Sequence, residues 1–147
     1  MGKGSKRIPS GKLLPDSGKK VQRQEDPDGF YQKHPSWRFQ DADKENWVLS
    51  KDSFWDSVMP FLVSLESMTW DSILRRSNNN HHFIKLMGLS SRAQAILARK
   101  KIDAEAVMSL RLQGKIRLYG IMADNVFSIL WLDDNPDCVC RSYLKHT

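Results

Sequence analysis

The chain has 147 residues and a formal net charge of +6, and the distribution of this charge excludes one class of protein. Residues 1–23 hold seven Lys and Arg against one Asp, which accounts for the whole excess. The remaining residues carry 16 basic and 16 acidic side chains and are neutral overall. A folded domain that binds nucleic acid through bulk positive charge is therefore not expected.

Length and composition predict one domain behind a basic tail. Residues 1–29 are rich in Gly, Ser, Pro, Lys and Gln, so packing cannot offset their loss of chain entropy, and we expect them to be disordered. Residues 30–147 are long enough for a single core. The longest apolar run falls far short of the roughly 20 residues that span a bilayer, and the tail lacks the apolar stretch of a secretory signal. We therefore expect a cytoplasmic protein without a membrane partner.

Three helices are predicted in the first part of the domain. A Ser or Thr precedes each of them, as is typical of a helix N-terminus. Residues 53–65 carry an apolar stripe at helical spacing, and Pro60 inside this stretch predicts a kink or a break. Residues 69–74 form a shorter candidate helix. Residues 90–101 form the third, which ends in three cations where the helix dipole favours them.

From residue 106 the pattern changes to the alternation that is typical of strands. Residues 106–112 and 116–122 alternate around a Gln-Gly turn, and residues 126–132 form a continuous apolar run that suits a central strand. Residues 138–143 are a candidate edge strand. Together these segments predict an α+β fold, with N-terminal helices packed on one face of a C-terminal three- or four-stranded antiparallel meander.

The C-terminal part of the sequence carries a resemblance. Residues 109–147, which begin SLRLQGKIRLYG and end SYLKHT, together with residues 65–74, resemble a family of small uncharacterised bacterial proteins. Members of this family end in a Trp-x-Asp-Pro strand, a following His and a terminal Lys-His-Thr. The resemblance covers about residues 37–147 and implies a shared fold without an activity. This chain has Asp134-Asn135-Pro136-Asp137 where the Asp-Pro and His would stand, which leaves that turn without its histidine.

A second pattern resembles the RelE/ParE-type toxins of bacterial toxin–antitoxin pairs. It consists of helices followed by Arg117-x-Tyr119-x-Ile121 and then by the segment DNVFSIL at residues 124–130. The resemblance covers at most residues 50–145. It implies a small cytoplasmic protein with helices on an antiparallel sheet, a cognate antitoxin as partner and RNA as substrate. We accordingly predict a toxin-like endoribonuclease.

Metal-independent RNA cleavage needs a base, an acid and a cation that stabilises the transition state. Arg111 and Arg117 are candidate cations, because alternation places them on the polar face of neighbouring strands, and Tyr119 shares the face of Arg117. Lys145 and His146 could supply the cation and the acid or base. The simpler alternative is that the two arginines cover a solvated sheet face and that Tyr119 packs beside them.

The alternative function is a noncatalytic module that binds protein or nucleic acid through its arm and an exposed strand edge. Cations that contact phosphates give a salt-dependent affinity without sequence recognition. The predicted contacts of this kind lie in the tail and at the end of the third helix: Lys19, Lys20, Arg23, Arg99, Lys100 and Lys101. The sequence does not indicate the oligomeric state.

The histidines and cysteines do not form a metal-binding motif. His81 and His82 are adjacent, and their spacing to Cys138, Cys140 and His146 matches none of the standard structural zinc sites. On a strand the two cysteines would face the same side, where a disulfide between them would be strained. We therefore expect two free thiols, no metal and no cofactor.

Overall fold

The computed structural model of the chain describes residues 29–75, 80–134 and 138–141. The predicted disordered tail, residues 1–29, lies outside these described residues except for its last residue. In the described part of the chain, no helix has the length and apolar character needed to cross a membrane.

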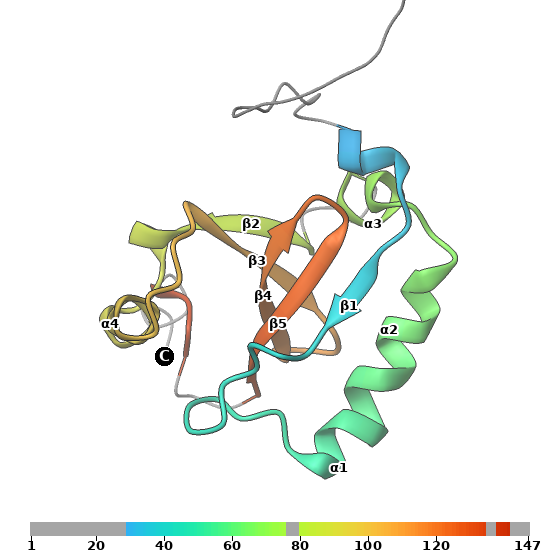
Figure 1. Ribbon diagram of the computed structural model, residues 1–147. Helices are drawn as coiled ribbons and strands as arrows, with labels where there is room; N and C mark the ends of the chain where they lie inside the picture. The colour runs from blue at the N-terminus through green and yellow to red at the C-terminus, as the bar shows by residue number, and fades with distance from the viewer. Residues whose placement is uncertain (1–28, 76–79, 135–137, 142–147) are drawn as a thin grey trace, which may run out of the picture. The chain divides into compact units, whose positions relative to one another are not determined.

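The chain divides into two units, Met1–Phe30 and Tyr31–Thr147. The second unit has an α+β architecture, as the sequence predicts. Within its described residues, five strands form one mixed sheet in the order β1-β5-β4-β3-β2 (Figure 1).

The centre of the sheet is the predicted antiparallel meander, which is confirmed. It consists of β3 (Ala106–Arg111), β4 (Arg117–Ala123) and β5 (Val126–Asp133). Both β4 neighbours are antiparallel to it. Pairing along β5 shifts by one residue at Leu130, so this strand carries a bulge beside Trp131. Nearly all of β5 is buried, as the continuous apolar run predicts.

Two further strands show that the predicted three- or four-stranded antiparallel sheet is wrong. β1 (Ser36–Arg38) pairs in parallel with β5, and β2 (His82–Lys85) pairs antiparallel with β3. These strands have three and four residues, too few for alternation to distinguish them from loop. An edge strand is also predicted at residues 138–143. Of these, residues 138–141 are described, and they form one isolated bridge, between Cys140 and Leu89, in place of a strand.

The first helical segment contains a π-helical turn between two α-helical parts. α1 (Lys51–Ser53), the π-helical turn η3 (Phe54–Val58) and α2 (Met59–Glu66) follow one another without interruption. Pro60 has no N–H to donate, and its ring would collide with the carbonyl four residues earlier in a regular α-helix. The widened turn before Pro60 relieves this collision, so the predicted kink or break takes the form of a π turn.

The remaining helical elements are short. α3 (Trp70–Arg75) and α4 (Ser91–Arg99) occur where the sequence predicts helices. Ser90 begins α4, because its side chain accepts a hydrogen bond from the Ala93 backbone N–H at 3.2 Å. Two 3-10 turns, η2 (Gly29–Gln32) and η4 (Leu86–Gly88), complete the described elements.

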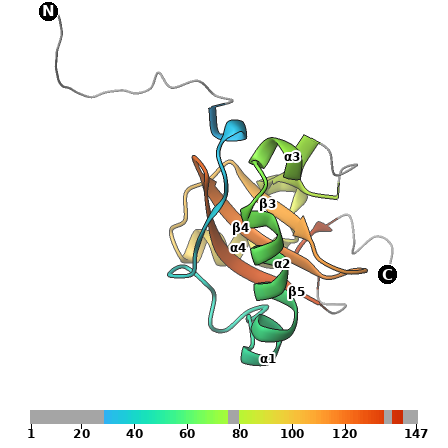
Figure 2. The same cartoon turned by 90° about the vertical axis from the view of Figure 1, so that its right-hand side faces the viewer.

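Helices cover both faces of the sheet, so the predicted packing on one face is wrong. Figure 2 shows α2 in front of the sheet and α4 behind it. On the α3 side, Trp70 packs against Phe127 of β5 with ring centroids 6.4 Å apart, and Trp37 of β1 contacts both rings. A strand that is apolar on both faces is stable only when both are covered, and β5 is such a strand.

Candidate functional site

The turn between β3 and β4 brings two predicted site residues together. Arg111 and Arg117 lie directly opposite each other in the strand register. Arg111 Nε donates to the Gly114 carbonyl oxygen at 3.0 Å, and Arg117 Nη1 donates to the same oxygen at 2.9 Å. Gly114 has a positive φ of 53°, which turns the chain tightly here. Two guanidinium groups therefore converge on one carbonyl oxygen.

The two arginines differ in exposure. Arg111 is exposed, whereas Arg117 is only 9% exposed and does not lie on the solvated face that alternation predicts. Arg117 stands opposite Asp133 of β5, and the Asp133 carboxylate accepts the Val139 backbone N–H at 2.7 Å. The chain at Val139 is thereby held over this end of the sheet. Arg111 can contact a ligand directly, while Arg117 can act on it only through charge.

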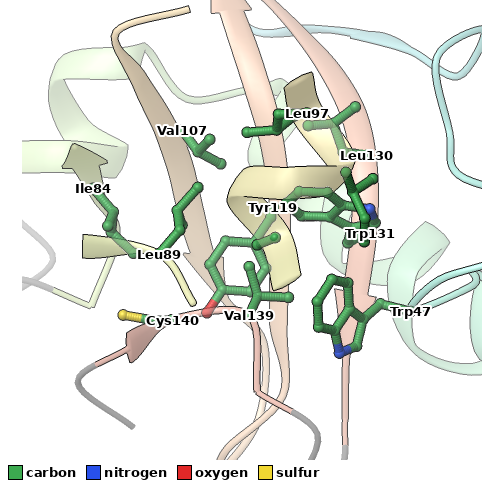
Figure 3. Packing of buried hydrophobic residues seen from close by; sticks show 12 residues of the cluster. Trp47, Ile84, Leu89, Leu97, Val107, Tyr119, Leu130, Trp131, Val139 and Cys140 are labelled. Carbon is green, nitrogen blue, oxygen red and sulfur yellow. The ribbon is translucent and has the colours of Figure 1, made fainter. Parts of the chain in front are cut away.

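Tyr119 lies in the hydrophobic core. It is fully buried in a cluster with Leu97 of α4, Trp131 of β5 and Val139 (Figure 3). It shares the sheet face of Arg117, as predicted, but this face is covered. A catalytic contact between Tyr119 and RNA would require the core to open.

The other predicted site residues are not at the hairpin turn or are not described. Lys145 and His146, and likewise Lys19, Lys20 and Arg23, lie outside the described residues. Arg99 ends α4, and Lys100 and Lys101 follow it, all three exposed. The Lys100 ammonium approaches a carboxylate oxygen of Asp43 at 3.9 Å.

His81 is a member of the site that the sequence does not reveal. Its Nδ1 accepts the Arg111 backbone N–H at 3.0 Å, and Arg111 Nη1 donates to Asn80 Oδ1 at 3.2 Å. The sequence shows only an adjacent histidine pair in a loop. The contact arises because β2 pairs with β3, across a separation of 30 residues.

Burial is the largest cause that lowers the pKa of His81 below its usual 6.5. The positive charges of His82, Arg117 and Arg111 lower it further, while a hydrogen bond with the Asn80 backbone opposes them. Burial and these charges therefore favour the neutral imidazole, whose Nδ1 lone pair accepts the Arg111 N–H.

One buried carboxylate, that of Asp43, has a structural role. Residues 40–45 line an open cavity of about 510 Å³ together with Lys100 and Ile102. Asp43 is buried in its wall and accepts hydrogen bonds from the Glu45 backbone N–H at 2.9 Å and from Trp131 Nε1 at 2.9 Å. Burial raises the pKa of Asp43, but its hydrogen bonds outweigh this and lower the pKa to about 2. This carboxylate is a fixed anion that holds the loop to the core.

The described histidines, cysteines and acids do not assemble a metal site: no group of three or more of them could hold an ion. Cys138 is half-buried and Cys140 is buried, and these two described cysteines form no disulfide.

Comparison with known proteins adds no family. A scan against protein-family models, a search of curated proteins and a search of solved structures each found no match.

Proposed function

We propose that the protein is a noncatalytic module that binds the phosphate backbone of RNA at the β3–β4 hairpin turn. The observation that carries this proposal is the convergence of the Arg111 and Arg117 guanidinium groups on the Gly114 carbonyl oxygen. Two positive charges close to one carbonyl oxygen add to the positive potential at the exposed Arg111, and such a potential attracts an anion.

The surrounding sequence supports an anionic ligand. Residues 80–117 contain eight Lys and Arg against two Asp and Glu, a net charge of +6. This stretch includes β2, α4 and the hairpin turn, in which Lys115 is exposed. The hydrogen bonds from Arg111 Nε and Nη1 fix the plane of its guanidinium group, so less side-chain entropy is lost when it binds a phosphate.

The charges of the two arginines also act on His81. Burial is the largest cause of its lowered pKa, and Arg117 and Arg111 lower it further because positive charge disfavours the imidazolium form. Guanidinium groups hold a phosphate without reading a base.

The geometry favours binding over cleavage. A general base must accept a proton at a nitrogen or oxygen lone pair, and the Nδ1 lone pair of His81 is already occupied by the Arg111 N–H. Tyr119, the other described candidate for proton transfer, is buried. The toxin-like endoribonuclease with a cognate antitoxin stays a prediction, in which Lys145 and His146 would have to supply the chemistry.

The test is the salt dependence of RNA binding by the full chain. Fluorescence anisotropy of a short labelled single-stranded RNA is measured between about 50 and 200 mM salt. Arg111→Gln should weaken binding several-fold at low salt and reduce the slope of log K against log salt by about 0.7, the value for one phosphate contact on a single strand. Arg111→Lys keeps the charge and should keep the slope. The charge-matched control is Lys51→Gln, an exposed cation in α1.

Equal affinities for Arg111→Gln and Lys51→Gln would contradict the proposal and assign binding to other cations. Thermal unfolding of each variant establishes that the hairpin remains folded. The same RNA is analysed for fragments on a denaturing gel, and fragments formed by the full chain but not by a variant lacking Lys145 and His146 would favour the endoribonuclease.

A further inference from the structure

Three aromatic rings, Phe39, Phe54 and Trp55, form a patch on the surface of the domain. Phe39 follows β1, and the other two belong to the π turn η3. Ring centroids lie 5.7 Å apart for Phe39 and Phe54 and 5.1 Å apart for Phe54 and Trp55, both edge-to-face. Phe39 is 43% exposed and Trp55 is 56% exposed. A connected group of exposed aromatic rings is typical of an interaction surface.

Trp55 differs from the other tryptophans of the chain, all of which lie in described segments. Trp47, Trp70 and Trp131 are buried in the core, and Trp37 is half-buried between β5 and α3. The Trp55 indole contacts the Phe54 ring edge-to-face, and the π turn that carries both residues is closed by a hydrogen bond from the Met59 N–H to the Phe54 carbonyl.

Acidic residues are frequent in the stretch of sequence that carries this patch. Residues 39–56 contain five Asp and Glu against two Lys, a net charge of −3, and of the five acids Asp43 is buried. Asp52 and Asp56 are exposed and lie one helical turn apart, on either side of Trp55 in the sequence. Within the described part of the chain, neither of them forms an ion pair. The surface thus combines exposed ring faces with negative charge that has no partner among the described residues.

A surface that combines aromatic rings with carboxylates favours the binding of a cation. Aromatic ring faces attract guanidinium and ammonium groups, and carboxylates beside them add to the attraction. The fold already uses this chemistry, because the Arg92 guanidinium lies 4.5 Å from the Trp47 ring centroid and the Arg75 guanidinium lies 3.9 Å from that of Tyr31. Nucleic-acid bases also stack on aromatic rings, but their phosphates would be repelled by this acidic surface.

The geometry points to a docking site for a basic peptide segment of a partner protein. An Arg or Lys of this segment would stack on Trp55, and neighbouring cations would pair with Asp52 and Asp56. The charge of this surface is opposite in sign to that of the β3–β4 turn, so the inference is independent of the proposed RNA binding.

The experiment uses the full chain and a short synthetic peptide in which Arg alternates with Gly, with a Glu-Gly peptide of equal length as the opposite-charge control. NMR follows the indole N–H resonance of Trp55, identified by its absence in Trp55→Phe. The Arg peptide should shift this resonance, and the Glu peptide should not. Trp55→Ala should weaken peptide binding about tenfold, and Asp52→Asn with Asp56→Asn should weaken it and reduce its salt dependence. Val63→Ala, at a similarly exposed apolar residue of α2, should leave binding unchanged.

The proposal is overturned if Trp55→Ala binds the Arg peptide as the unchanged chain does, or if Val63→Ala is equally damaging. It is also overturned if single-stranded RNA shifts the Trp55 resonance while the Arg peptide does not, which would assign the patch to nucleic acid. A Trp55 resonance that moves with protein concentration alone would assign the patch to a second copy of the chain and would likewise exclude the basic partner.

Discussion

Replacing Asp43 by Asn tests whether one buried anion holds the loop of residues 41–47 on the sheet. The carboxylate accepts the backbone N–H groups of Glu45 and Asn46 and the indole N–H of Trp131, at distances of 2.9 to 3.0 Å. An Asn side chain has one acceptor oxygen and one amide donor. If its oxygen keeps the backbone N–H groups, its NH₂ group faces the Trp131 N–H, and two donors oppose each other.

The magnitude follows from the pKa. In the folded protein the pKa of Asp43 is about 2, against the ordinary value of 3.8 for an Asp carboxyl. At about 1.4 kcal/mol for each pKa unit, the folded state favours the charged form by about 2.5 kcal/mol. The unmet donor in the variant adds to this cost, so Asp43→Asn should lower the free energy of unfolding by about 3 kcal/mol at neutral pH.

The sign of the pH dependence is fixed by the same shift. Because the pKa is lower in the folded state, the stabilisation by Asp43 is complete above about pH 4 and is lost as the pH falls through about 2. Urea unfolding curves of the two proteins, followed by circular dichroism, should therefore differ most at pH 7 and converge near pH 2. The control is Asp41→Asn, an exposed residue of the same cavity, which should change stability little. A difference that stays constant from pH 7 to about pH 2 would refute the reasoning.

Three other predictions concern the sheet and its helices. Arg111→Gln removes a cation near His81 and should raise the pKa of this histidine toward 6.5 in an NMR titration; the loss of stability on acidification below about pH 6.5 should shrink accordingly. Gly120→Ala should destabilise the domain by about 3 kcal/mol in denaturant unfolding, since the added Cβ would lie 2.5 Å from the Ser128 carbonyl oxygen. Ser90→Ala removes the cap of α4 and should lower the free energy of unfolding by about 1 kcal/mol, measured in the same way.

The centre of the fold could be predicted because its signals are local. β4 and β5 show clear patterns over seven and eight residues and are joined by a two-residue turn at residues 124–125. β1 and β2 are defined by pairing with distant strands, as when Trp37 pairs with Phe127. A three-residue strand of this kind leaves no periodic pattern in its own sequence.

The candidate site could be predicted in part for the same reason. The hairpin places Arg111 opposite Arg117, and alternation around a turn is enough to anticipate this. The burial of Arg117 could not be anticipated in the same way, because alternation around the turn places this residue on the solvated face. His81 joins the site only through the pairing of β2 with β3, so its part in the site could not be read from adjacent residues.

The parallel pairing of β1 with β5 has a consequence for the order of folding. Ser36 pairs with Val126, so this contact closes a loop of about 90 residues, whereas β3, β4 and β5 are joined by tight turns. Contacts across such long loops form late, and a three-residue edge strand is also among the first parts to open. The amide protons of β1 should therefore exchange with solvent faster than those of β4. Release of β1 would separate Phe39 from Phe54 without unfolding the central sheet.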